Sequence, residues 1–210
     1  MRVLVLCNDD WHPADTVRHG LAPLNRDWDF VFLENSAEWS AKAMDAFPLV
    51  ILAKSALASP PKPDLWLTNE SAQAFVDFVQ RGRGLFVVHS GSSRYDSLPS
   101  MKALLGSSFV LHPEPCAVTH EPNAQHPISA GTKAFTVRDE HYFMSPLAKD
   151  ATVFLQSRSE YGLQPAGWTR TEGRGRVCVL TPGHFCEVWL HPEYQQVLAN
   201  ALRWTANTGQ

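Results

Sequence analysis

The chain has 210 residues, enough for one large α/β domain, and a hydrophobic fraction of 44% that is typical of a soluble protein with a sizeable core. A net charge of −3 and a pI near 6.3 argue against a general affinity for nucleic acid or for anionic membrane. No apolar run approaches the roughly 20 residues of a membrane-spanning helix, and the N-terminus lacks the pattern of a secretory signal. The four cysteines form no CxxC motif, so we expect reduced thiols and a cytoplasmic location.

The first half of the chain alternates short apolar runs with amphipathic segments. Strands are expected at 3–7, 29–33, 48–53 and 84–88. Helices are expected at 14–24, at 37–46 behind a cap at Asn35 or Ser36, and from a cap at Thr68 to Gly82. The Pro-rich stretch 59–64 between them is expected to be a loop. This alternation predicts a mostly parallel sheet with helices on both faces, a three-layer α/β/α sandwich.

The second half of the chain does not continue this alternation of strands and helices. Residues 109–120, 133–138 and 151–156 are expected to be extended, and the runs 166–170 and 176–180 flank a turn, which predicts an antiparallel hairpin. A C-terminal helix is expected over 193–205. No linker or internal repeat divides the chain, so we expect a single domain over 1–210.

Polar side chains follow several of the predicted strands, at the edge of the sheet where ligands bind in open parallel sheets. Asp10 and His12 follow the first strand, and His89 and Ser90 follow the strand at 84–88. The remaining candidates are His184 in TPGHF, Glu140 and Tyr142 after TVRD, and His112 after an extended run. The glycine before His184 would let the chain approach a neighbour closely. Because such residues follow several strands that are far apart in the sequence, they favour a shared pocket of imidazoles and carboxylates.

Each of these residues also has a structural interpretation. A histidine at a strand end often only forms a structural hydrogen bond, Asp10 and His12 could cap the next helix, and Glu140 could belong to a solvated acidic pair with Asp139. The aromatic side chains of Trp11, Tyr142 and Trp168 could contact a bound substrate or belong to the core. Three other motifs fit known catalytic patterns poorly. Residues 88–92 lack the first glycine of a serine nucleophile elbow, Cys186 lacks the setting of a cysteine nucleophile, and 173–177 is too short for a phosphate-binding loop. A divalent metal such as zinc is chemically plausible, although no HxxxH or HxH spacing supports it.

The motifs between residues 82 and 208 together resemble one family. GRGLFVVHSGS, LLGSSFVLHP, HPISAG, VRDEHYF, EGRGRVCVLTPGH, HPEY and LRWTANT occur in an order similar to that of the trehalose-utilisation (ThuA-like) family. The resemblance implies the flavodoxin-like sheet of class I glutamine amidotransferases, with His89 at or beside the position of their nucleophilic cysteine, which argues against glutamine hydrolysis. It also implies that His89, Glu140 and His184 lie in the polar pocket of the family, with His112 nearby. The implied substrates are trehalose, related disaccharides or oxidised (3-keto) sugars.

Two hypotheses of function follow. The first is an enzyme acting on a small carbohydrate, an isomerase or hydrolase with Glu140 or His89 as the base. His184 would be the acid or would stabilise an oxyanion, and a bound metal could polarise a carbonyl instead. The second is a non-catalytic sugar-binding or oligomerising module that kept the fold. A homo-oligomer could use Trp39, expected to be exposed, and the hairpin at 166–180.

Overall fold

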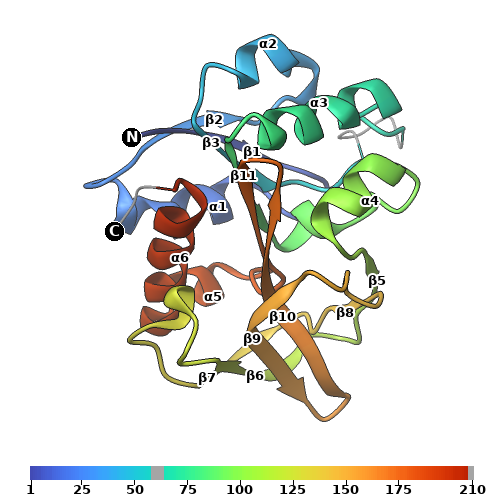
Figure 1. The fold of residues 1–210 in the computed structure, drawn as a ribbon. Coiled ribbons are helices and arrows are strands. Elements are labelled where there is room, and N and C mark those ends of the chain that lie inside the picture. Colours follow the sequence, from blue (N-terminus) through green and yellow to red (C-terminus); the bar gives the residue numbers. More distant parts are fainter. Residues whose placement is uncertain (58–63, 208–210) are drawn as a thin grey trace.

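The computed structural model describes residues 1–57 and 64–207 (Figure 1). The loop expected at 59–64 lies outside the described residues except for its last position. The strands are β1 (Arg2–Cys7), β2 (Asp29–Leu33), β3 (Leu49–Ala53), β4 (Gly84–Val88), β5 (Phe109–Leu111), β6 (Cys116–Pro122), β7 (Phe135–Asp139), β8 (Phe143–Met144), β9 (Thr152–Ser159), β10 (Gly162–Glu172) and β11 (Gly175–Leu180). The α-helices are α1 (Ala14–Leu21), α2 (Ala41–Met44), α3 (Asn69–Gln80), α4 (Pro99–Leu105), α5 (Cys186–Leu190) and α6 (Pro192–Thr205), and the 3₁₀ turns are η1 (Ala22–Leu24), η2 (Ser36–Glu38), η3 (His89–Ser92) and η4 (Pro127–Ser129).

The main sheet has nine strands in the described part of the chain, in the order β2-β1-β3-β4-β11-β10-β9-β6-β7. The pairs along β2-β1-β3-β4-β11 are parallel, and the remaining pairs are antiparallel. β5 and β8 form a separate two-stranded antiparallel sheet. The predicted parallel sheet is therefore confirmed for the strands of the first half together with β11. The antiparallel part is much larger than the single hairpin expected.

The parallel strands separate two buried clusters of apolar side chains. Alternate residues of β1 point to opposite faces, so that Val5 joins the cluster containing α1, α5 and α6 side chains, whereas Leu6 joins the cluster containing α2, α3 and α4 side chains. Figure 1 shows these helices on the two sides of the strands. Strands buried on both faces are apolar along their whole length, as the sequence of β3 shows.

Helices differ from the prediction mainly between residues 36 and 46. The helix expected at 37–46 is instead the turn η2, capped by Asn35, followed by the four-residue α2, whose first turn is capped by the Ser40 hydroxyl. Between them Trp39 is extended, and its ring stacks on Phe75 at 5.4 Å between centroids. The prediction of an exposed Trp39 was therefore wrong, because its indole packs half-buried on α3.

The hairpin at 166–180 is confirmed, but its strands are not available as a sheet edge. β10 pairs with both β9 and β11, and β11 pairs with both β10 and β4. The backbone groups of this hairpin are used inside the sheet, so a dimer contact there would have to use its side chains or its turn, and that contact stays a prediction. Among the described helices, none combines the length and apolar character needed to cross a bilayer.

Candidate functional site

Four side chains from distant segments meet at the carboxyl ends of the parallel strands. His12 lies in the loop after β1, His89 directly follows β4, His184 lies in the loop after β11, and Glu140 follows β7. One ligand atom from each residue lies within 4.8 Å of the others. The sequence predicted that these segments would converge, and the structure brings the side chains together.

Glu140 lies at the centre of this group. Its Oε2 is 3.4 Å from Nε2 of His89 and 3.3 Å from Nδ1 of His184, and its Oε1 is 3.5 Å from Nε2 of His112. Burial alone would raise the pKa of Glu140, but its contact with His184 holds that pKa well below its usual range. Burial would likewise lower the pKa of His184, and the Glu140 carboxylate reverses this and raises it. The centre therefore carries an ionised carboxylate among imidazoles.

His89 is held in an unusual conformation. Its backbone φ is +47°, a left-handed value that is uncommon for a residue other than glycine, and its side chain is almost completely buried. Nδ1 lies 2.7 Å from the carbonyl oxygen of Thr181. A carbonyl only accepts, so Nδ1 carries the hydrogen and Nε2 faces Glu140 with a lone pair when the ring is neutral. Burial lowers the pKa of His89 to about 4, which favours this neutral form.

His12 is fixed by a carboxylate that the sequence analysis did not select. Oδ1 of Asp9 accepts a hydrogen bond from Nδ1 of His12 at 2.6 Å and from the His12 backbone N–H at 3.1 Å, while Oδ2 accepts from the Ser55 N–H at 2.9 Å. Burial raises the pKa of Asp9, but the contact with His12 and the backbone donors outweigh it and lower the pKa to about 2. Asp10, the predicted residue, is exposed and contributes nothing to the pocket lining.

Asp139 is the second carboxylate that sequence reasoning missed. It is completely buried and accepts hydrogen bonds from the backbone N–H groups of Gly183 at 2.8 Å and His184 at 3.0 Å. Burial raises its pKa to about 7. Gly183 has a φ of +134°, and a side chain there would meet the Trp189 indole nitrogen at 3.1 Å, so the predicted close approach before His184 is confirmed. Asp139 and Gly183 together set the position of the His184 backbone.

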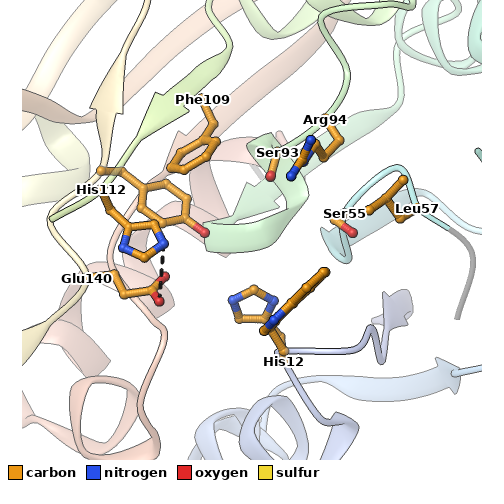
Figure 2. Close-up of a pocket in the computed structure, with 10 residues that line it drawn as sticks. His12, Ser55, Leu57, Ser93, Arg94, Phe109, His112 and Glu140 are labelled. Atoms are coloured by element: carbon orange, nitrogen blue, oxygen red, sulfur yellow. Dashed lines mark ion pairs between the residues drawn. The ribbon is translucent and has the colours of Figure 1, made fainter. Parts of the chain in front are cut away.

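A pocket of about 250 Å³ opens above these residues (Figure 2). In Figure 2 the His12 ring and the Glu140 carboxylate point toward one another across it, and Arg94 and Ser93 lie on another wall. His89 and His184 are not among the lining residues of this pocket. The lining residues are Trp11, His12, Ser55, Leu57, Ser93, Arg94, Phe109, His112, Glu140 and Tyr142.

The predicted substrate contacts divide into two groups. His12, His112 and Tyr142 line the pocket, as does the exposed Trp11, and the Tyr142 ring stacks on His89 at 4.2 Å. Ser90 is buried in η3 and is not among the lining residues. Trp168 was wrongly predicted to contact substrate. It is fully buried in the core on the α3 and α4 side, where its indole N–H donates to the Leu105 carbonyl at 2.8 Å.

Several lining residues carried no sequence signal of function. Ser55 and Leu57 follow β3, and Ser93 and Arg94 follow η3, so all four come after strands of the parallel sheet. The rule that pointed to the histidines would have found Ser55, Ser93 and Arg94 had it been extended to every polar residue after β3 and η3. Arg94 also has a positive φ of 67°, which only the structure reveals.

The fold is a mixed α/β fold that is similar to that of glutamine amidotransferases. A glutamine amidotransferase from Thermotoga maritima is similar with a TM-score of 0.65 at 13% identity, covering 98% of each chain. A ThuA-like protein from Bacteroides uniformis matches with a TM-score of 0.77 at 18% identity, covering 98% of this chain and 91% of that one, and a cytoplasmic protein from Salmonella typhimurium matches with a TM-score of 0.68 at 11% identity, covering 98% and 99%.

The family model described as ThuA, trehalose utilisation, matches residues 2–205. The chain therefore belongs to the ThuA family. Comparison with curated proteins gives no match.

Proposed function

We propose that this protein is an enzyme of carbohydrate utilisation that acts on a small sugar carrying a carbonyl group, a keto-sugar derived from trehalose or a related disaccharide. Membership of the trehalose-utilisation family supports a role in carbohydrate use. The observation that carries the enzymatic part is the convergence of Glu140 with the imidazoles of His12, His89 and His184 beside a pocket. Charged and proton-exchanging groups concentrated at one pocket are typical of catalytic sites.

The size and lining of the pocket fit a sugar ring. Its volume of about 250 Å³ is near the lower end of the range for small-molecule sites, about 300–1,000 Å³. One ring fits inside, and the second ring of a disaccharide would lie outside against Trp11, whose exposed indole offers an apolar face. The polar groups Ser55, Ser93 and Arg94 would bind hydroxyl groups of the inner ring.

The geometry favours one of the two bases that the sequence proposed. Glu140 lines the pocket, whereas His89 is buried behind it, so Glu140 is the group that would reach a substrate proton. It would take the proton from the carbon next to the carbonyl. His184, whose side chain is 19% exposed and contacts the same carboxylate, would give a proton to the oxygen of the resulting enediolate. Glu140 would then return its proton to the former carbonyl carbon while His184 takes the proton from the other enediol oxygen, which completes an isomerisation.

Hydrogen exchange next to the carbonyl tests this proposal directly. The protein is incubated in D₂O with 3-keto-trehalose, and deuterium incorporation is followed by NMR while products are followed by mass spectrometry. We expect incorporation that Glu140→Gln slows by about 10²–10⁴-fold. Glu160→Gln, at an exposed carboxylate in the β9–β10 turn, should have no effect.

Other outcomes separate the alternatives. Binding of the sugar with neither exchange nor conversion would identify the non-catalytic module, and no binding at all would contradict the carbohydrate assignment. None of the cysteines lines the pocket, which supports the proposal that the protein is not a glutamine amidotransferase. Their unpaired thiols also support the proposed cytoplasmic setting. Homo-oligomerisation stays a prediction.

A further inference from the structure

We propose that His12, His89, His184 and Glu140 bind one divalent transition-metal ion of the zinc type. This inference deepens the proposed function and rests on it for the chemical purpose of the ion. Ion binding itself can be measured without any substrate, so the two proposals can fail separately.

The distances around Glu140 match those of a tetrahedral zinc site. Zinc binds histidine nitrogen and carboxylate oxygen at about 2.0–2.1 Å, which places tetrahedral donors about 3.4 Å apart. Oε2 of Glu140 lies 3.4 Å from His89 Nε2 and 3.3 Å from His184 Nδ1. His12 completes a set of four ligand atoms that all lie within 4.8 Å of one another, close enough for small side-chain rotations to bring them to one ion.

Three of the four donor atoms form no hydrogen bond with any residue that the structure describes. Nε2 of His12, Nε2 of His89 and Nδ1 of His184 are all buried and lack a hydrogen bond. Buried polar atoms without partners are rare in native proteins, and each needs an explanation such as an ion. Here three of them surround one carboxylate, which a metal ion would satisfy together.

The hydrogen bonds on the far sides of two rings fix the tautomer that a metal requires. Nδ1 of His12 donates to the Asp9 carboxylate, and Nδ1 of His89 donates to the Thr181 carbonyl. Both rings therefore present a lone pair on Nε2, and lone pairs facing the Glu140 carboxylate repel it unless a cation or a proton lies between them. Metal-bound histidines almost always donate their other N–H to a carboxylate or a carbonyl in this way.

The donor types select the class of metal. Three imidazoles and one carboxylate suit zinc, copper, nickel or iron, whereas magnesium and calcium prefer sites made wholly of oxygen atoms. An ion held by Glu140 Oε2 would polarise the substrate carbonyl. With Glu140 and His184 bound to the ion, a different group would have to transfer the substrate proton. His112 is outside this ligand set, lines the pocket and contacts Oε1 of Glu140 at 3.5 Å, so it would take that role.

The test measures ion binding to protein that has been freed of metal with a chelator. Zn²⁺ is titrated in competition with a chromogenic chelator, and Co²⁺ is added separately to record its visible absorption spectrum. We expect one ion per chain and the intense visible bands of tetrahedral Co²⁺. Glu140→Gln, His184→Asn and His89→Asn should each weaken Zn²⁺ binding at least 10-fold; asparagine at 89 tolerates the positive φ.

Matched controls separate this site from adventitious binding at surface histidines. His19→Asn and Glu160→Gln change an exposed imidazole and an exposed carboxylate and should leave Zn²⁺ affinity unchanged. His112→Asn should keep the ion but lose deuterium exchange on the keto-sugar. The Co²⁺ spectrum requires no variant, so it stays decisive even if His89→Asn does not fold.

Two results would overturn the metal site. One is the absence of stoichiometric Zn²⁺ binding by the parent protein, and the other is binding that Glu140→Gln and His184→Asn leave unchanged. Ion binding without turnover would retain the site and reject the enzyme, whereas full turnover by the metal-free protein would retain the enzyme and reject a catalytic role for the ion.

Discussion

Nδ1 of His12 lies 2.6 Å from Oδ1 of Asp9, and the same carboxylate accepts the backbone N–H groups of Trp11, His12 and Ser55. One buried side chain thereby joins the end of β1 to the end of β3 and turns the His12 ring toward Glu140. Asp9 is not itself among the lining residues and acts on the pocket through Trp11, His12 and Ser55, so it is a positioning residue.

Replacing Asp9 with asparagine tests this role. The amide oxygen of Asp9→Asn can still accept backbone N–H groups, but it removes the charge that holds His12. We expect a loss of about 1–3 kcal/mol in the free energy of unfolding, the range for a hydrogen bond to a charged group. Zn²⁺ affinity should fall about 10–100-fold, as is typical when an outer partner of a metal ligand is changed.

Asp10→Asn is the matched control, because Asp10 is the exposed neighbour. Urea unfolding and Zn²⁺ competition should give parent values for it. Equal effects of the two substitutions would show that the loop depends on its overall charge and not on the contact between Asp9 and His12.

The sequence predicted the parallel part of the fold because each of those strands is a short, continuous apolar run that can be recognised without knowing its neighbours in the sheet. A run such as GLFVV is apolar throughout, and β4 begins and ends at the predicted residues. The antiparallel extension could not be predicted in the same way. β6 and β9 pair across more than 30 residues, with His120 opposite Ser157, and only tertiary contacts fix such a register.

The same division applies to the site. The carboxyl-end rule located His12, His89 and His184, since it depends only on where strands end. It could not choose between Asp9 and Asp10, because that choice depends on which side chain turns inward, and Asp9 is buried whereas Asp10 is exposed. Nor could it place Trp168, because the rule does not say which face of the sheet a side chain of β10 occupies. Trp168 packs in the buried cluster with side chains of α2, α3 and α4.

Gly183→Ala should disturb the position of His184. The backbone φ of +134° is strained for any residue with a Cβ, and that atom would lie 3.1 Å from Nε1 of Trp189. We expect a loss of about 1–3 kcal/mol in the free energy of unfolding and weaker Zn²⁺ binding, measured by urea unfolding and chelator competition.

Gly131→Ala separates backbone strain from displacement of the site. Gly131 also has a positive φ, of +76°, but a Cβ there has no atom within 4 Å. It should lose stability while keeping Zn²⁺ affinity. Parent-like Zn²⁺ affinity in Gly183→Ala would refute the positioning role of this glycine.

The two tryptophans assigned to sugar stacking should respond in opposite ways. Trp168→Phe leaves the Leu105 carbonyl without its donor inside the core, so we expect a loss of about 1–3 kcal/mol in the free energy of unfolding. Trp11→Ala changes a side chain that is 62% exposed and should alter stability by no more than about 0.5 kcal/mol. In the keto-sugar assay, Trp11→Ala should raise KM, and Trp168→Phe should leave KM unchanged. A raised KM for Trp168→Phe alone would restore the original assignment.

Acid sensitivity should depend on a histidine outside the site. His120 is buried on β6, where Nδ1 lies 2.7 Å from the Ser157 hydroxyl and the ring packs on Phe135. Burial, with smaller contributions from the charges of His141 and His191, lowers its pKa to about 3. The unfolded chain, with a pKa near 6.5, therefore binds the proton first as the pH falls.

The neutral ring is the form compatible with the fold, so its contribution to stability is fully present above about pH 6.5 and is lost as the pH falls toward 3. Between pH 7 and pH 5 we expect the free energy of unfolding to fall by about 2 kcal/mol from this residue. Urea unfolding at both pH values measures the loss. His120→Gln cannot titrate and should show a loss smaller by that amount, whereas His19→Gln, at an exposed imidazole, should follow the parent. A parent-like acid loss in His120→Gln would assign the sensitivity to another group.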